Sequence, residues 1–447
     1  MFLVQLIKTL LVYLLINLPF VLLAGFLDVS RPWFNLDFAL ILTLFSLGFF
    51  WIGTLLAGFF ILLDLLAIFV QVFPFIRVSD ALYLLQMFFY ASESYQLYTL
   101  LVGIFFISSW GLIAWLQKHT SRLPSLLNLN ALLFMYLLLL GLGFNQDRNH
   151  RQVDASMFVQ SQSEYFIATR FNGFASLFNG EKDPFKEYAG SSLTNIMQLE
   201  GTVADKVLLV VAESWGVPKN LEIQKAILQP LIDLTGSTHQ AGDFQFIGAT
   251  VAAEFRELCN LHPEHFNLKG LNKDYSRCLP NKLQNKGYTS LAVHGATSNV
   301  YDRYAWYPDV GFQETLFYEN RNWPRRCYSF PGACDLDMLE EVADFLQEPG
   351  KRFAYWLTLN SHATYDSRDI FEDHFDCSTF SIHSGEACRN LKLHAQFFSA
   401  LASKLQSFKE SGLQVAVVGD HEPRLMNLAE KNNIFISQRV PWIFFTL

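Results

Sequence analysis

Residues 206–216, Lys-Val-Leu-Leu-Val-Val-Ala-Glu-Ser-Trp-Gly, decide the fold. After Lys206 comes a continuous apolar run, which is typical of a strand buried on both faces of a parallel sheet. Similar short runs recur downstream and alternate with helical patterns, as in β/α units. The candidate strands are Lys206–Ala212, Thr289–Val293, Phe353–Leu359, Leu413–Gly419 and Val440–Leu447, and the clearest helices between them are Asp335–Leu346 and Leu391–Lys409. We therefore expect an α/β domain with a mainly parallel sheet over residues 201–447.

Polar side chains follow four of these strands, at the point where each strand ends. They are Glu213, His294, His362 and the pair Asp420-His421. Ligands of open α/β sheets bind beyond the carboxyl ends of the strands. One such residue alone is more often a turn or cap residue, but four sets at one edge indicate a site. Glu213, Asp420 and His421 are ligands that suit Zn²⁺ or Mn²⁺.

Thr250 is the candidate nucleophile of this site. It opens the amphipathic run Val251–Leu261, and two interpretations are open. A Thr at this point is an ordinary helix N-cap. Alternatively, its hydroxyl lies at a helix N-terminus that can bind phosphate oxygens, and a metal ion lowers the hydroxyl pKa enough to make it a nucleophile.

Charge divides the chain into two parts. Only 17% of the 447 residues are charged, and residues 1–145 contain ten of these side chains, five acidic and five basic. The net charge of −8 therefore lies wholly in residues 146–447. An acidic domain without clustered Lys and Arg argues against a nucleic-acid partner. The low charge and apolar composition of residues 1–145 predict that they form a membrane anchor domain.

Five membrane spans are expected in this anchor, because a spanning helix needs about 20 apolar residues. Residues 2–27 form one span, residues 37–73 a helical hairpin broken near Gly53, and residues 97–117 and 127–145 two more. The alternative is four spans, with 37–73 as a single tilted helix. The stretch around residues 81–95 mixes apolar and polar side chains and suits a helix lying at the membrane surface.

The basic connector at residues 117–122 should be cytoplasmic, which places the chain after Asn145 on the outer side of the membrane. Asp64 is the only ionisable residue deep inside a span. Such a residue is a functional candidate by default. One carboxylate alone makes a poor ion pathway, so a structural role and an anchor are preferred to a transporter.

All six cysteines lie after residue 250, which supports export, because disulfides form in oxidising compartments. They fall in three close pairs, Cys259 with Cys278, Cys327 with Cys334 and Cys377 with Cys388. Other pairings are open, and we favour the sequential one. No C-x-x-C pair supports a metal cluster. Residues 146–200 carry no strand pattern and are expected to be a linker packing along the exported domain.

These motifs together resemble the alkaline phosphatase/sulfatase superfamily, and within it the membrane-bound lipoteichoic acid synthases and phosphoethanolamine transferases. The segments that carry the resemblance are 210–216, 250–255, 293–303 with Tyr301 and Arg303, 357–362 and 418–421. The resemblance covers roughly 206–447. It implies that Glu213, Thr250, Asp420 and His421 bind the metal, and that His294, Tyr301, Arg303 and His362 bind substrate.

The activity that the resemblance implies is a two-step transfer on the outer side of a bacterial cytoplasmic membrane. Thr250 takes the headgroup phosphate of phosphatidylethanolamine or phosphatidylglycerol, and a hydroxyl of a surface glycan or glycolipid then accepts it. Glu422-Pro423 follows His421 where the family commonly has Gly, which leaves the acceptor side open.

Three alternatives to this transferase are a phosphodiesterase, a sulfatase and an inactive envelope-assembly scaffold. For the sulfatase, Cys278-Leu279-Pro280-Asn281-Lys282 is a near match to the nucleophile motif C-x-P-x-R.

Overall fold

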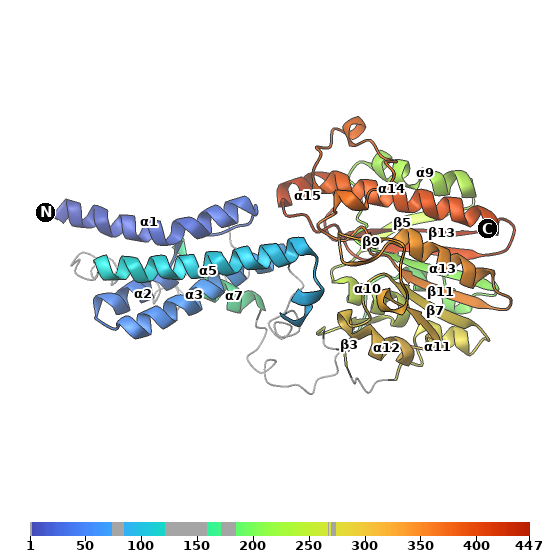
Figure 1. The fold of residues 1–447 in the computed structure, drawn as a ribbon, viewed down its shortest axis with the longest axis horizontal. Coiled ribbons are helices and arrows are strands. Elements are labelled where there is room, and N and C mark those ends of the chain that lie inside the picture. The colour runs from blue at the N-terminus through green and yellow to red at the C-terminus, as the bar shows by residue number, and fades with distance from the viewer. Residues whose placement is uncertain (1, 74–84, 121–158, 171–184, 267, 270–273) are drawn as a thin grey trace. The chain divides into compact units, whose positions relative to one another are not determined.

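The chain folds as two compact units, residues 1–78 with 97–181 and residues 79–96 with 182–447. The structure is a computed structural model that describes residues 2–73, 85–120, 159–170, 185–266, 268–269 and 274–447 (Figure 1). The predicted span 127–145 lies outside these residues. The limits 1–145, 146–200 and 201–447 stay a prediction. Within the predicted linker, residues 159–170 belong to the first unit and residues 185–200 to the second.

The first unit is helical. Its elements are α1 (Phe2–Phe26), β1 (Phe34–Asn35), α2 (Asp37–Ser46), α3 (Phe50–Val72), most of α5 (Glu93–Thr120), β2 (Val159–Gln160) and α7 (Gln162–Arg170). Among the described residues, two helical segments are long and apolar enough to cross a membrane, Phe50–Val72 and Glu93–Leu116. The expectation of five spans is therefore wrong for this part of the chain.

The hairpin predicted over residues 37–73 is where the span count fails. The chain breaks at Leu47–Phe49 rather than near Gly53, with Gly48 at φ +87°, where glycine is favoured. This leaves α2 with 10 residues, about 15 Å of helix, which is too short for a bilayer core of about 30 Å. Gly53 instead lies under the Phe45 ring, because a Cβ there would approach that ring to 2.3 Å. Gly53 is thus a packing position, and Gly48 makes the turn.

A buried ion pair holds the first unit together. The guanidinium of Arg31 binds the carboxylate of Asp64 at 2.7 Å, and both side chains are fully buried. Asn35 donates to the same carboxylate at 3.0 Å, and Asn17 accepts from Arg31 at 3.0 Å. The only deep carboxylate of the predicted spans therefore has a partner on a connecting segment, in line with a structural role.

The second unit is an α/β domain, as predicted, built on a seven-stranded sheet of order β5-β13-β12-β4-β11-β7-β8. The strands are β4 (Lys206–Ala212), β5 (Gln240–Gln245), β7 (Thr289–His294), β8 (Glu314–Leu316), β11 (Arg352–Leu357), β12 (Gln414–Gly419) and β13 (Arg439–Thr446). From β12 to β8 neighbours are parallel, and β13 is antiparallel to both of its neighbours. The prediction located five of the seven strands and missed β5 and β8.

Helices cover both faces of this sheet. The remaining elements of the unit are η2 (Phe88–Tyr90), β3 (Phe185–Glu187), α8 (Leu193–Ile196), η4 (Leu199–Gly201), α9 (Leu221–Thr235), α10 (Thr250–Cys259), β6 (Leu261–Pro263), α11 (Leu279–Gln284), η5 (Val300–Asp302), α12 (Arg303–Asp309), η6 (Tyr318–Asn320), β9 (Arg326–Cys327), β10 (Gly332–Ala333), α13 (Asp335–Gln347), η7 (Ser367–Asp369), η8 (Cys377–Phe380), α14 (Glu386–Leu405), η9 (Gln406–Phe408) and α15 (Leu428–Ile434). Figure 1 shows α9 beside α14, with α11 and α12 grouped away from them.

Alternation along the central strands explains the two layers. Leu208 and Val210 of β4 and Trp356 of β11 join the buried cluster formed with α9, α13 and α14. The neighbouring residue Tyr355 points the other way and meets Tyr307 of α12, with ring centroids 6.2 Å apart. Strands buried on both faces need continuous apolar sequence, which is why the run 207–212 was readable.

The three disulfides follow the sequential pairing that the spacing favoured. They join Cys259 to Cys278, Cys327 to Cys334 and Cys377 to Cys388. Each closes a short loop of the second unit, and no cysteine is left free. Cys278 is therefore bonded in a disulfide and is not available as a sulfatase-type nucleophile.

The Arg31–Asp64 pair gives a stability prediction for the first unit. Asp64→Ala should destabilise it by about 3–5 kcal/mol, because Arg31 is left buried without its counter-charge. Thermal unfolding of the detergent-solubilised protein measures the loss. The double variant Arg31→Met/Asp64→Leu removes both charges and should recover most of it. An Asp64→Ala protein as stable as the original would show that the pair is not structural.

Candidate metal and nucleophile site

The pairing of β4 with β12 brings two carboxylates together. Gly419 lies opposite Ala212 in the parallel register, and the peptide N–H of Asp420 donates to the Ala212 carbonyl at 3.0 Å. Glu213 and Asp420 are the next residues of the two strands, so the sheet itself fixes them side by side. His421 follows directly.

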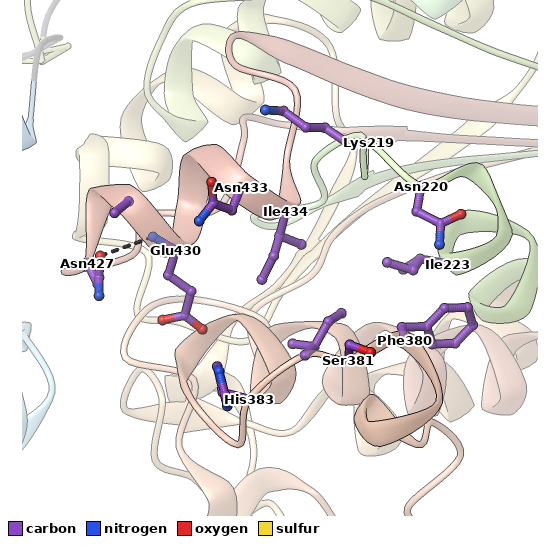
Figure 2. Close-up of a pocket in the computed structure, with 12 residues that line it drawn as sticks. Lys219, Asn220, Ile223, Phe380, Ser381, His383, Asn427, Glu430, Asn433 and Ile434 are labelled. Atoms are coloured by element: carbon purple, nitrogen blue, oxygen red, sulfur yellow. Dashed lines mark hydrogen bonds between the residues drawn. The ribbon is translucent and has the colours of Figure 1, made fainter.

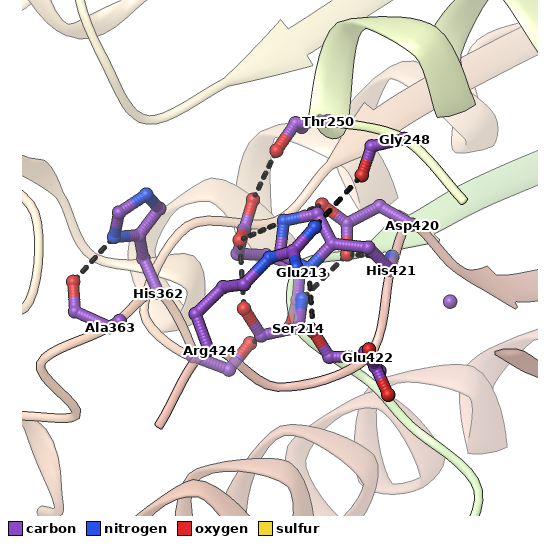
Figure 3. Close-up of polar contacts among 12 residues, drawn as sticks. Glu213, Ser214, Gly248, Thr250, His362, Ala363, Asp420, His421, Glu422 and Arg424 are labelled. Carbon is purple, nitrogen blue, oxygen red and sulfur yellow. Dashed lines mark hydrogen bonds and ion pairs between the residues drawn. The ribbon is translucent and has the colours of Figure 1, made fainter. Parts of the chain in front are cut away.

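Glu213, Asp420 and His421 form one buried group (Figure 3). One ligand atom from each lies within 4.8 Å of the others. The Nε2 atom of His421 is 3.5 Å from Glu213 Oε1 and 3.4 Å from Asp420 Oδ2. Of the residues that the sequence proposed as metal ligands, these three are thus brought together by the fold.

Thr250 completes the group from the other side. It is the first residue of α10, and the N-cap position belongs to Ala249. Its hydroxyl donates instead to Glu213 Oε2 at 3.1 Å. The capping interpretation of Thr250 is therefore wrong, and its oxygen faces the carboxylate cluster from the N-terminal end of a helix, where the helix dipole favours negative charge.

Burial sets the charge state of the site. It raises the pKa of Glu213 well above the ordinary range, and the nearby Asp420 carboxylate raises it further. It lowers the pKa of His421 to about 4, so that the imidazole is neutral at physiological pH. A neutral imidazole is the form that binds metal ions. Two adjacent carboxylates in a buried place favour either a shared proton or a cation.

One oxygen of this site has no hydrogen-bond donor. Asp420 Oδ1 accepts the peptide N–H groups of Ser214 at 2.6 Å and His421 at 2.5 Å. Asp420 Oδ2 is buried and has no hydrogen-bond partner among the residues described. Buried acceptors are rarely left in this state without a ligand or an ion. With two carboxylates, an imidazole and a hydroxyl, the donor set fits Zn²⁺ or Mn²⁺.

His294 ends β7, the second strand along the sheet from β4. Its Nδ1 donates to the Leu357 carbonyl at 3.1 Å, which leaves Nε2 as the acceptor nitrogen. Burial, and then the positive charge of Arg303, lower its pKa well below the ordinary value. His294 is therefore a neutral, oriented imidazole. Its role in binding substrate stays a prediction.

His362 lies in the loop after β11 and is set apart from the Glu213 group in Figure 3. Its Nδ1 donates to the Ala363 carbonyl, and its ring meets the rings of Phe330 and Tyr95, with centroids 5.0 and 6.2 Å away. Burial lowers its pKa. Tyr95 belongs to the stretch predicted to lie along the membrane surface, of which residues 81–84 are outside the described part.

Arg303 and Tyr301 are placed differently from the other proposed substrate residues. Arg303 is buried and binds Glu254 of α10 at 2.7 Å, and Tyr307 donates to the same carboxylate at 2.5 Å. The Tyr301 ring lies 5.3 Å from the Arg303 guanidinium. These contacts connect α12 to the helix that begins at Thr250. Contact of Arg303 or Tyr301 with substrate stays a prediction.

Sequence reasoning missed Asp335, which shapes the loop that carries His362. Its carboxylate accepts the peptide N–H of Leu359 at 2.9 Å and of Asn360 at 2.8 Å, and the Asn360 side chain accepts the N–H of Asp335 at 2.6 Å. Asp335 is the first residue of α13, where an acidic side chain looks like an ordinary dipole partner. That expectation hid its longer-range role.

Sequence reasoning also missed Arg256, which connects α10 to the end of β12, next to Asp420. Its fully buried guanidinium donates to the Gly419 carbonyl at 2.8 Å and to the Asp420 carbonyl at 3.4 Å. It pairs with Glu257 at 2.7 Å and lies 4.2 Å from the Phe246 ring. An Arg on the apolar face of a helix was the available signal, because such a residue needs buried partners.

Residues 205–433 match the sulfatase family. This is just over half of the chain, and the chain belongs to that family. Among curated protein sequences, none matches it.

Three solved structures are among those to which the chain is similar. The lipoteichoic acid synthase LtaP from Listeria monocytogenes is 15% identical, with a TM-score of 0.43 over 57% of this chain and 71% of that one. The Streptococcus pyogenes phosphoglycerol transferase GacH in complex with sn-glycerol-1-phosphate is 17% identical, with 0.40 over 57% and 72%. The C-terminal periplasmic domain of EcEptC from Escherichia coli in complex with Zn is 12% identical, with 0.39 over 59% and 75%.

The site gives a prediction for metal binding and its pH dependence. A group with a raised folded-state pKa stabilises the metal-free protein most below its ordinary pKa, and this stability is lost as the pH rises through the raised value. Glu213 is such a group. A metal ion replaces the proton, so the gain in melting temperature on adding Zn²⁺ or Mn²⁺ should be larger at pH 8 than at pH 5. At 100 times Kd it should correspond to about 2.7 kcal/mol.

Differential scanning fluorimetry of the protein with and without each metal measures this gain. Asp420→Asn should abolish most of it, whereas Asp243→Asn, on the edge strand β5, should leave it intact. A gain of equal size in Asp420→Asn would place the metal elsewhere.

Arg256 gives a second prediction. Arg256→Met keeps the length of the side chain but removes its bonds to Glu257, Gly419 and Asp420, so unfolding should be easier by about 3–5 kcal/mol, the loss expected from breaking a buried pair. Metal affinity should fall as well, because the Asp420 carbonyl loses its hydrogen bond from Arg256 and the carboxylate is positioned less firmly. Chemical denaturation and metal titration measure the two effects. Normal stability and metal affinity in Arg256→Met would contradict this role.

Proposed function

We propose that the protein is a metal-dependent transferase that moves the headgroup phosphate of a membrane phospholipid to a hydroxyl of a cell-surface glycan or glycolipid. The observation that carries the proposal is the Thr250 hydroxyl, 3.1 Å from Glu213 in a buried carboxylate–imidazole site. A hydroxyl held there by a carboxylate, at the start of a helix, is a nucleophile for a phosphodiester.

In the first step, the Thr250 oxygen forms a bond to phosphorus, and the bond from phosphorus to the diacylglycerol oxygen breaks. Glu213 accepts the hydroxyl hydrogen bond, orients the nucleophile and would take the hydroxyl proton as the bond to phosphorus forms. The leaving oxygen takes a proton, which a nearby imidazole, His294 or His362, would supply after protonation from solvent. In the second step, an acceptor hydroxyl attacks the phosphorus and its proton passes to that neutral imidazole. The bond from phosphorus to the Thr250 oxygen breaks, and Glu213 returns the proton to Thr250.

A Zn²⁺ or Mn²⁺ held by Glu213, Thr250, Asp420 and His421 would supply Lewis-acid stabilisation of the negative charge that develops on the phosphoryl group. The N-terminal end of α10 adds its partial positive charge at the same place. His294, with its Nδ1–H donated to the Leu357 carbonyl, offers Nε2 as an acceptor for the proton of an attacking hydroxyl, and would donate to a phosphate oxygen once protonated. Tyr301 and Arg303 would contribute to binding the phospholipid donor.

A lipid donor explains why two long apolar helices precede this domain. They would keep the enzyme in the membrane that holds its substrate, with the disulfide-bonded domain on the periplasmic or extracellular side, where disulfides persist. The transferred group is phosphoethanolamine or phosphoglycerol. A phosphodiesterase would use the same Thr250 with water in the second step, and the experiment below separates the two.

Incubation with phosphatidylethanolamine or phosphatidylglycerol tests the proposal. Mass spectrometry of the peptide containing Thr250 should show a phosphoethanolamine or phosphoglycerol adduct, and Thr250→Ala should lose it and lower diacylglycerol release by about 10³-fold or more, as for other nucleophile deletions. Thr250→Ser, which keeps the hydroxyl, should form the adduct.

Diacylglycerol release that is undiminished in Thr250→Ala would refute this nucleophile. An adduct that discharges only to water, whichever acceptor is supplied, would assign a phosphodiesterase.

A further inference from the structure

A cavity of about 530 Å³ lies in the second unit, and none of the four residues of the metal and nucleophile site lines it. Figure 2 shows its walls. The helix α15 forms one side, Asn220 and Ile223 at the start of α9 form the other, and the loop with Phe380, Ser381 and His383 closes it below. That loop lies within the Cys377–Cys388 disulfide, so one wall is covalently restrained.

The lining combines neutral hydrogen-bonding groups with apolar side chains. Ile223, Phe380 and Ile434 supply the apolar contacts, and the amide of Asn433 and the hydroxyl of Ser381 supply both donors and acceptors. The cavity also has one ammonium and one carboxylate, from Lys219 and Glu430, so its formal charges cancel. A neutral ligand with apolar C–H faces and a rim of hydroxyl groups fits this surface, and a sugar ring has both features.

Two of the lining amides are held in fixed orientations. The Asn220 carbonyl accepts the peptide N–H of Glu222 at 3.0 Å, and the Asn427 carbonyl accepts that of Glu430, also at 3.0 Å. Both residues are helix N-caps. Each amide therefore offers its N–H donors from a set position, which lowers the cost of ordering the site when a ligand binds.

Glu430 provides an acceptor whose donor is missing. Its Oε1 atom is buried and makes no hydrogen bond within the described part of the chain. The carboxylate fits there because residue 385 is a glycine, whose Cβ, if present, would lie 2.9 Å from that oxygen. A buried carboxylate oxygen without a donor is costly on its own, and a ligand hydroxyl would satisfy it.

Glu422 connects this cavity to the segment that carries the candidate metal ligands Asp420 and His421. Glu422 is buried, binds Lys431 of α15 at 2.8 Å and accepts the peptide N–H of Gln438 at 2.9 Å. This is the position where the sequence departs from the common Gly of the family. The helix that forms one wall of the cavity is therefore fixed to the segment that carries two of the candidate metal ligands.

We propose that this cavity binds the carbohydrate chain that accepts the phosphoryl headgroup. The proposal rests on the transferase function above. On this proposal the cavity serves only the second half-reaction. The acceptor would bind beside α15, which Glu422 connects to the segment carrying Asp420 and His421, while the lipid donor reacts at Thr250. The ligand class is a neutral polysaccharide, chosen by the amide-rich lining, the balanced charge and the unsatisfied acceptor of Glu430.

The test fills the cavity with a bulky side chain. Asn433→Trp places an indole in the cavity, and Asn432→Trp, on the same helix but outside the lining, is the matched control. The full-length protein in detergent is loaded with whichever labelled phospholipid forms the Thr250 adduct, and the polysaccharide fraction of the source cell envelope is then added. Adduct formation and discharge are followed separately by mass and by label.

Asn433→Trp should form the adduct at the original rate but discharge it to polysaccharide at least about tenfold more slowly, which corresponds to 1.4 kcal/mol of lost acceptor binding. Asn432→Trp should behave as the original protein. His383→Trp, from the loop that closes the cavity, should reproduce the effect and guard against a folding defect in one variant.

Discharge at the original rate in both cavity variants would overturn the proposal, and so would label that passes to protein rather than polysaccharide. If the original protein forms no adduct at all, it is the transferase function that fails, which keeps the two failures distinct.

Discussion

The structure of the α/β domain depends on one electrostatic constraint, the placement of Glu213 and Asp420 side by side in a buried position. Two carboxylates in a place of low dielectric repel each other, and desolvation penalises each charge. The domain surrounds them with compensating groups. Peptide N–H groups bind one oxygen of Asp420, the Thr250 and Ser214 hydroxyls bind Glu213, and a neutral His421 borders both. One cation, the buried guanidinium of Arg424, already interacts electrostatically with both carboxylates, and a divalent ion held by these residues would add further positive charge.

The sheet that creates this constraint was readable from sequence because its central strands are buried on both faces. The bounds of β4 agree with the prediction at both ends, and β12 differs by one residue at its start. The strand β5, Gln-Ala-Gly-Asp-Phe-Gln, was missed because it is an edge strand with mostly polar, exposed residues. In the helical unit, the turn fell at Gly48 instead of near Gly53, since hydropathy does not distinguish a glycine that turns the chain from one that admits a neighbouring ring.

Site residues could be predicted where chain topology alone brings them together. Glu213, Asp420 and His421 follow adjacent parallel strands, and that fact needs no knowledge of side-chain packing. Asp335 and Arg256 act through hydrogen bonds to peptide groups far away in sequence, so no local pattern marks them. For Arg303, the structure shows a buried ion pair with Glu254 that its motif did not predict, and the predicted contact with substrate stays a prediction.

The position of β13 in the sheet has a consequence for the folding of the newly made chain. This strand, Arg439–Thr446, lies between β12 and β5, and it is the sheet neighbour through which β5 joins the other strands. A chain that emerges from its N-terminal end exposes β5 about 200 residues before the partner of that strand is available. During that interval the segment that leads to Thr250 has an unpaired edge, which invites wrong pairing. The sheet around the start of α10 is therefore completed late in folding, so an arrested or truncated chain would contain the first helical unit without a finished α/β sheet.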